Sequence, residues 1–448
     1  MQEIVEKAVI FLIYFVVLEP MITKYIFNNV IFKYLPEVII YGLAALFVIF
    51  QISENKKIAI LKHELSLIVL PAYIFVITVI INKIDIQIFF LSIRTLYRYI
   101  VLYFIVANIE FTEENIGRIL KHIRWCGIIV LLVGVLQILL PQLMNPILMP
   151  KVYKIGNIDR ESSIVVIDGK AIFSLFERYD RYGTFLIILI FLILAGVYKN
   201  KCNILIIILA SINMVFTYSR QSWIGLGAGL LVGLVLEKRY FIIFFVSSAA
   251  ALGLTVLLTS EYVVQDIYFG SPFQRVLQVF SPSYMQTNLE SARLRIFVDV
   301  LPEFLSGFKI YTIFGLGIGS FADLANSMTN YELYMRYFLL FDVEYSGTYH
   351  VSDVYWIELT MELGIIGIAI FGIYFIRTFG YYYDNYKRKE SRFLKQLNLL
   401  AIRLTVSTII INFFGPNMLI TGYSFFLWLL LGITVRSNSI KETLEGEA

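Results

Sequence analysis

Long, continuous apolar runs recur along the whole chain and limit what it can fold into. A helix that crosses a bilayer needs about 20 mainly apolar residues. Twelve such runs lie at 8–27, 35–52, 66–81, 88–109, 125–140, 183–198, 203–218, 222–236, 240–259, 354–376, 397–414 and 418–434. Only 16% of the residues are charged, against about 25% in soluble domains. We therefore expect an all-α integral membrane protein with about 12 transmembrane helices, which excludes a soluble enzyme.

The counts of cysteine, histidine and charge exclude several other classes of protein. Two cysteines, Cys126 and Cys202, and three histidines are too few for a disulfide scaffold or a Cys/His metal site. We expect neither a metal nor a cofactor, and the small net charge of +4 gives no reason to expect nucleic acid. The first run is not a cleavable signal peptide, because Glu3 and Glu6 precede it and no small-residue cleavage site follows.

The short loops between the runs carry much of the lysine and arginine, which predicts the orientation of the chain. With twelve spans these residues share the cytoplasmic face with both termini. They are Lys56, Lys57, Lys62, Arg118, Lys121, Arg124, Lys199, Lys201, Lys238, Arg239, Arg377, Lys387, Arg388, Lys389, Arg392, Lys395, Arg436 and Lys441. The outer face then carries stretches 141–182 and 260–352. We expect one polytopic membrane domain, 1–448, with 260–352 as a large, partly helical extracytoplasmic loop between spans nine and ten.

Three segments of this outer loop have a recognisable pattern. Residues 287–306 have apolar positions at helical spacing, with Arg293 and Arg295 in the first turns near the membrane surface. Residues 313–321, IFGLGIGSF, form a glycine-rich turn, which is not a nucleotide-binding loop because no strand precedes it. Residues 328–352 are rich in acids and tyrosines, among them Tyr349. These tyrosines either stack on sugar rings or form an aromatic belt at the membrane interface.

Three arginines lie near membrane depth, where a charge is costly and marks a functional candidate. Arg220 lies at the outer end of span seven and either binds an anion or reaches lipid headgroups and caps a helix. Arg94 and Arg98 are one helical turn apart in span four and share a face. Two guanidiniums on one face can hold a diphosphate through bidentate hydrogen bonds; the alternative is simple contact with headgroups.

Acids and one histidine cluster around the start of span ten. Asp353 and Glu362 flank that start but do not share a helix face, and Glu362 lies deeper. His350 precedes Asp353 by three residues and is the only histidine on the predicted outer face. A general base near neutral pH is either His350 or an Asp353 with a raised pKa. Asp353 is equally suited to cap the helix.

Taken in order, these residues resemble the bacterial O-antigen polymerase and O-antigen ligase family. The pieces that match are Ser219-Arg220; Ser291, Arg293 and Phe297; Gly317, Gly319 and Phe321; and Asp353 followed by Glu362, Leu363, Gly364 and Gly367. Each piece alone is weak, and their order, spacing and topology make the resemblance specific. It covers about 205–370, and the earlier spans agree only in number and hydropathy.

The resemblance implies a glycosyltransferase in the inner or plasma membrane that works on the outer face. The donor is a saccharide on undecaprenyl diphosphate, an acceptor hydroxyl attacks its anomeric carbon, and the lipid diphosphate leaves without help from a metal. Arg220 and Arg293 would stabilise that leaving group, because fixed guanidiniums favour developing negative charge. Asp353 or His350 would be the base, and Arg295, Glu362 and Tyr349 are candidates for contact with the substrate.

Two departures from the family pattern favour one reaction over the other. Ligases typically have histidine and asparagine where this chain has Asp353 and Val354, and Phe297 stands where the family often has tryptophan. We therefore expect a polymerase of lipid-linked repeat units, with a chain-length regulator and a flippase as candidate partners. The alternatives are a ligase that transfers the glycan to a terminal acceptor, and a transporter or flippase of lipid-linked saccharides. A transporter should carry polar groups along a central path rather than at the outer surface.

Overall fold

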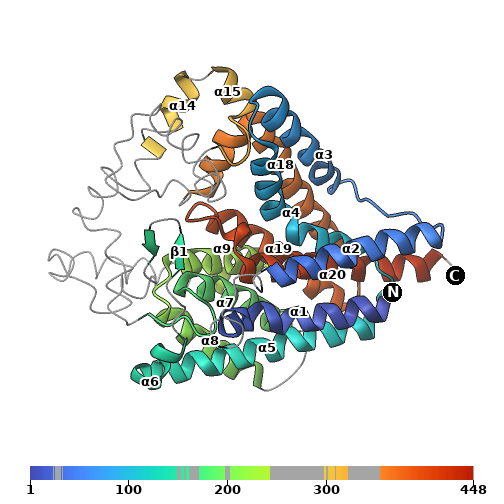
Figure 1. The fold of residues 1–448 in the computed structure, drawn as a ribbon. Coiled ribbons are helices and arrows are strands. Elements are labelled where there is room, and N and C mark those ends of the chain that lie inside the picture. The colour runs from blue at the N-terminus through green and yellow to red at the C-terminus, as the bar shows by residue number, and fades with distance from the viewer. Residues whose placement is uncertain are drawn as a thin grey trace.

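The computed structural model describes most of the membrane-spanning part of the chain and a few pieces of the long loops. The described residues are 1–23, 25, 32, 34–148, 153–155, 158–160, 171–196, 202–242, 297–298, 301–307, 309–320 and 354–446. Over these residues the chain is almost entirely helical (Figure 1). The only strands among the described residues form one short antiparallel hairpin, β1 (Tyr153–Ile155) and β2 (Ile158–Arg160). The all-α prediction did not include this hairpin.

The described helices follow the predicted apolar runs. They are α1 (Gln2–Ile22), α2 (Leu35–Ser53), α3 (Leu65–Phe75) with its π-helical continuation η3 (Val76–Ile81), α4 (Ile86–Asn108), α5 (Glu113–Leu139), α6 (Pro141–Leu148), α7 (Tyr179–Leu194), α8 (Cys202–Phe216), α9 (Arg220–Leu236), α14 (Leu301–Gly307), α15 (Lys309–Phe314), α18 (Tyr355–Arg388), α19 (Arg392–Ile411), the 3₁₀ turn η9 (Asn417–Leu419) and α20 (Thr421–Gly446).

Several of these helices are long and apolar enough to cross a membrane. Five described helices meet that standard, namely α2, α4, α5, α18 and α19, and three shorter apolar helices accompany them, α3 with η3, α8 and α9. The chain is therefore a multi-pass, predominantly α-helical membrane protein. The total of twelve spans stays a prediction, since the ninth, 240–259, lies mostly outside the described residues, as does most of the predicted 260–352 loop.

Two helices begin well before their apolar runs, for reasons that the hydropathy does not contain. Helix α5 begins at Glu113, because Thr112 and Asn115 form a capping box that satisfies the first backbone amides. Helix α1 begins at Gln2, and its buried Glu6 accepts hydrogen bonds from Arg118 Nε at 2.6 Å and Asn115 Nδ2 at 2.6 Å. The polar first turns of α1 and α5 therefore bind each other instead of lying free in water.

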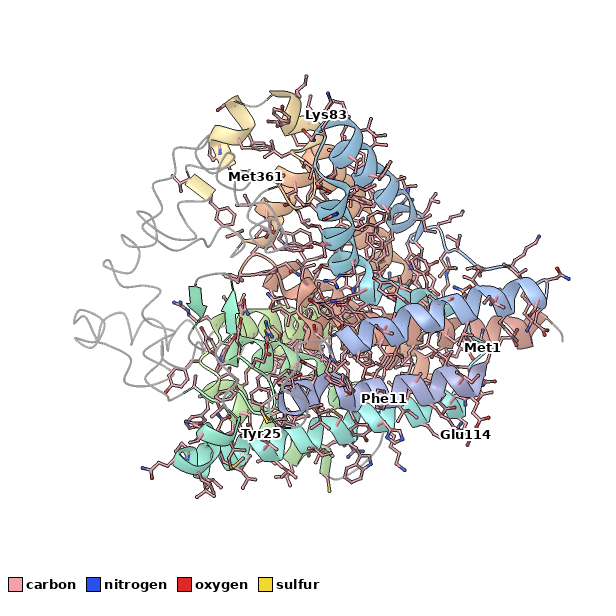
Figure 2. The ribbon with its side chains drawn as sticks, viewed as in Figure 1. Met1, Phe11, Tyr25, Lys83, Glu114 and Met361 are labelled. Carbon is pink, nitrogen blue, oxygen red and sulfur yellow. The ribbon has the colours of Figure 1, made fainter. Side chains whose placement is uncertain are left out.

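Two ends of the molecule serve as reference points for the helices. We call the end where α1 and α5 begin the terminal end, and the end where α9 and α20 begin the loop end. Figure 2 places Met1 and Glu114 together at the terminal end and Tyr25 at the opposite end of α1. The marked N and C positions also lie together at the terminal end (Figure 1). The described pieces of the long outer stretches, β1, α14 and α15, lie away from that end.

Helix α19 connects two helices that begin at the loop end, because it packs against both α9 and α18. Along α9, Gly225, Gly229 and Gly233 are four residues apart and face Ile411, Ser407 and Arg403 of α19. The Ser407 hydroxyl donates to the Gly225 carbonyl at 2.6 Å. Small residues at this spacing let two membrane helices approach closely, so α9 is fixed against α19 along its length, including the end that carries Arg220.

Candidate functional site

A three-residue turn places Arg220 at the start of α9. Thr217 donates its hydroxyl proton to the Met214 carbonyl at 2.7 Å, and Tyr218 adopts a positive φ of 57°. Ser219 then takes an extended conformation as the N-cap of α9, and its hydroxyl lies 2.7 Å from that of Ser222. Arg220 is consequently the first residue of the helix, where the helix dipole adds partial positive charge to that of the guanidinium.

The connection between α19 and α20 brings the start of α9 to the start of α18. We call residues 412–420 the crossing loop. Gln221 Nε2 donates to Asn417 Oδ1 at 3.3 Å, while Asn417 Nδ2 donates to the Ile411 carbonyl at 2.8 Å. At the other side, the Tyr355 amide donates to the Asn412 carbonyl at 3.1 Å. All of these side chains are buried, so the crossing loop holds Arg220 and the first turn of α18 in one region.

Arg94 and Arg98 reach the same region from α4. As their spacing predicts, they share a face, and both form ion pairs with Glu37 of α2, Arg94 Nη1 at 3.2 Å and Arg98 Nη1 at 3.0 Å. Arg98 Nη2 also donates to the carbonyl of Leu419 in the crossing loop. The Glu37 side chain is only 7% exposed, so its carboxylate offsets charge that would otherwise be buried. The role of Arg94 and Arg98 as ligands of a diphosphate stays a prediction.

The glycine-rich turn predicted at 313–321 contacts a break in α18. Gly364 interrupts that helix with φ 65° and ψ −178°, a conformation that essentially only glycine adopts. The Leu316 amide donates to the Met361 carbonyl at 2.9 Å, and the Gly317 amide donates to the Glu362 carbonyl at 2.8 Å. A continuous helix would satisfy these carbonyls itself. The turn satisfies them instead and fixes α15 against α18.

The break divides α18 and leaves a half-helix, Tyr355–Leu363, at the loop end. It carries two carboxylic acids four residues apart, Glu358 at 4% exposure and Glu362 at 2%. Residues four apart lie on one helix face. Glu362 was a sequence candidate; Glu358 was missed, although an acid within a span, one turn from another, is itself a signal of function.

Comparison with known families places part of this region in a matched segment. Residues 205–372 match the model of the O-antigen ligase family. Over this segment the chain is similar to the O-antigen polymerase and ligase family. No curated protein matches the chain. The O-antigen ligase segment runs from α8 to beyond the break in α18, so Arg220, the glycine turn and Glu362 all lie within it.

The structure gives a physical reason for three of the motifs on which the resemblance to the O-antigen ligase family rests. The glycine turn and the Glu362-Leu363-Gly364 sequence are about 45 residues apart in the chain and bind each other directly through backbone hydrogen bonds. Ser219-Arg220 is held by α19 and the crossing loop, whose other side binds the first turn of α18.

Several sequence candidates lie outside the described residues. These are Arg293, Arg295, Tyr349, His350 and Asp353, together with Ser291 and Phe321 of the family pattern. Phe297 and Phe304 of the predicted 287–306 helix are described; Phe297 is exposed and Phe304, in α14, is fully buried. The described chain resumes at Val354, directly after Asp353. The roles of the five site candidates stay predictions.

The described loop end brings charged and amide side chains together from several helices. It holds three arginines, one carboxylate that pairs with two of them, and buried amides that fix the crossing loop. Within the described ranges, no three His, Cys, Asp or Glu side chains gather as metal ligands. Sequence reasoning missed Glu37 and Asn417. An acid in the first turn of an apolar span would have been the signal for Glu37.

Proposed function

We propose that the chain is a polymerase that joins undecaprenyl-diphosphate-linked oligosaccharide repeat units. A hydroxyl of the acceptor sugar forms a bond to the anomeric carbon of the donor, and the bond from that carbon to the diphosphate oxygen breaks. The hydroxyl proton passes to a base, for which Asp353 and His350 are the candidates. The electron pair leaves with the lipid diphosphate, whose growing negative charge requires fixed cations.

The observation that carries this proposal is the position of Arg220. It begins α9 beside the crossing loop, which also binds the first turn of α18, the helix that starts two residues after Asp353. A planar guanidinium can form paired hydrogen bonds to a phosphate, which a lysine ammonium cannot. A cation for the leaving group and a base for the acceptor would then lie at the same end of the bundle.

The lysines and arginines of the short loops, rather than the site itself, predict which side of the membrane the loop end faces. Lys56, Lys62, Arg118 and Arg377 belong to the predicted cytoplasmic fringe. Lys56 and Lys62 lie in the connection between α2 and α3, Arg118 lies near the start of α5, and Arg377 of α18 donates to the Lys62 carbonyl. The loop end would then be extracytoplasmic, in an inner or plasma membrane. A lipid-linked donor fits that side, because its sugar headgroup is presented there after transport by a flippase.

A ligase is the second candidate, since the matching family model is described as O-antigen ligase. The polymerase is favoured because Asp353-Val354 stands in place of the ligase-type histidine and asparagine. The two reactions differ in the acceptor. A polymerase uses a second lipid-linked repeat unit, whereas a ligase needs a terminal acceptor of another kind.

The test uses purified full-length protein in liposomes with undecaprenyl-diphosphate-linked repeat units as the sole saccharide. We expect longer lipid-linked chains, and we expect Arg220→Ala to slow their formation about 100-fold or more, the usual effect of removing one stabiliser of developing charge. Arg220→Lys should retain an intermediate rate, because the charge remains without the paired geometry. Arg377→Ala is the matched control, as this exposed arginine lies at the terminal end and donates to the Lys62 carbonyl.

The outcomes separate the candidates. Elongation by Arg220→Ala at the wild-type rate contradicts the proposed site. Wild-type protein that makes no longer chains, yet transfers the saccharide once a terminal acceptor is added, is a ligase. Saccharide that crosses the liposome membrane without any new glycosidic bond indicates a transporter.

A further inference from the structure

The hydroxyl of Tyr73 in α3 lies between two segments that are far apart in the chain. It is within hydrogen-bond distance of the Phe314 carbonyl at 2.9 Å and the Leu363 carbonyl at 2.8 Å. Phe314 ends α15, directly before the glycine turn, and Leu363 is the last residue before the break in α18. A phenol has one proton to donate, so the two carbonyls share it.

The π-helical continuation η3 and Asn82, the residue that follows it, bind the glycine turn at two further points. Asn82 Nδ2 donates to the Gly315 carbonyl at 3.2 Å, and the Ile318 amide donates to Thr78 Oγ1 at 3.0 Å. Each turn residue from Gly315 to Ile318 thus has a backbone group bound by η3, by Asn82 directly after it, or by α18. Figure 2 shows Lys83, just beyond η3, at the same side of the molecule as Met361.

Backbone carbonyls freed by a break in a membrane helix must find donors, since lipid offers none. The turn supplies two amides, to Met361 and Glu362, and Tyr73 supplies the donor for Leu363. Tyr73 is therefore the one side chain, among the described contacts of this break, that binds both the broken helix and the segment docked on it. We call Tyr73, Thr78, Asn82 and the turn 315–318 the clasp.

We propose that Tyr73 is a positioning residue whose hydroxyl fixes the break at Gly364 and so sets the direction of the half-helix Tyr355–Leu363. That half-helix carries Glu358 and Glu362 and starts two residues after Asp353. A shift of about 1 Å in catalytic groups can lower a rate about 100-fold. The consequence for catalysis rests on the function proposed above, whereas the consequence for the break does not.

The test compares Tyr73→Phe with Tyr97→Phe in the full chain. Tyr97 is the matched control: its hydroxyl donates to a backbone carbonyl of α3, that of Leu67, at 2.8 Å, but does not touch the break. Hydrogen exchange of the peptide over 314–320 reports on the Leu316 and Gly317 amides. We expect exchange to become about five- to tenfold faster in Tyr73→Phe, the size expected when one hydrogen bond is lost, and to stay unchanged in Tyr97→Phe.

Activity is measured on the same preparations, with the amount of folded protein equalised by size-exclusion chromatography. We expect Tyr73→Phe to lower kcat at least fivefold while KM for the lipid-linked saccharide changes less than twofold, because the described contacts that hold the start of α9 are made by α19 and the crossing loop and not by the clasp. A variant that only folds poorly would give a lower yield of folded protein, without the fall in kcat at constant KM.

Each outcome decides one part. Exchange over 314–320 that is equal in Tyr73→Phe and wild type overturns the proposal whatever the activity. Faster exchange with kcat equal to that of Tyr97→Phe overturns the positioning role. If wild-type protein forms no glycosidic bond at all, the proposed function fails, and the exchange experiment still decides whether Tyr73 fixes the break.

Discussion

Replacing Gly364 by alanine tests whether the break in α18 is built into the backbone. At φ 65° and ψ −178°, a residue with a Cβ is strained by about 1–3 kcal/mol. The added Cβ would also meet backbone atoms, the Ile313 carbonyl oxygen and, at 2.5 Å, the Gly315 nitrogen. Backbone cannot turn aside as a side chain can, and such overpacking costs about 1–3 kcal/mol more. Gly364→Ala should therefore lower the free energy of unfolding by about 2–6 kcal/mol.

Gly372→Ala, in the same helix, is the matched control. A Cβ at Gly372 meets no atom within 4 Å, and alanine favours a helix over glycine by about 1 kcal/mol. Its stability should equal or slightly exceed that of wild type. Denaturant unfolding of the purified proteins in mixed micelles measures both variants, and limited proteolysis over 309–320 shows whether the glycine turn has come off α18.

Two results would refute this reasoning about the break. One is an unfolding midpoint of Gly364→Ala equal to that of Gly372→Ala, with no new cleavage over 309–320. The other is a Gly364→Ala protein that is more stable than wild type, which would mean that α18 prefers to be continuous. Undocking of the turn without global unfolding would instead place the cost locally, and proteolysis would detect it.

Two further predictions concern charges elsewhere in the bundle. Glu37→Gln should lower the free energy of unfolding by about 3 kcal/mol, since it leaves the Arg94 and Arg98 guanidiniums without their shared carboxylate. Chemical denaturation measures the change, and Glu3→Gln at the surface is the control that should have no effect. Equal stability of the two variants would contradict the ion-pair assignment. At the terminal end, burial lowers the pKa of His63 to about 4, so the unfolded chain binds more protons than the folded one between about pH 4 and 6.5, and stability falls as the pH drops through that window. The stability difference between wild type and His63→Gln should accordingly shrink by about 3 kcal/mol from pH 7 to pH 4. A difference that does not change with pH would show that folding leaves the pKa of His63 unchanged, and would contradict the effect of burial.

The sequence predicts the helices and little of what holds them at the loop end. Apolar runs locate most spans because burial in lipid dictates them, but the early starts of α1 and α5 depend on Glu6, Arg118 and a capping box. The shared face of Arg94 and Arg98 follows from helix periodicity. Their partner Glu37 does not, because it lies 57 or more residues away and only packing brings it there.

The candidate site also has features that the sequence predicts and features that only the structure shows. The order of Arg220, the glycine turn and Glu362 is readable from the chain and led to the family. The contact between the turn and Gly364, and the part played by Tyr73, are not readable, since each joins residues that no local pattern relates. Asn417 had no signal in the sequence at all, because an asparagine after proline in a loop is ordinary turn chemistry.

The docking of the glycine turn on α18 has a consequence for exchanging parts between related proteins. Residues 315–318 and 361–364 satisfy one another's backbone groups, so neither can be transplanted alone without stranding polar groups of the other in lipid. A chimera that takes its outer loop from a relative with another saccharide has to carry both sides of this contact, or join the foreign loop beyond it. The two stretches behave as a single exchangeable unit although about 45 residues of chain separate them.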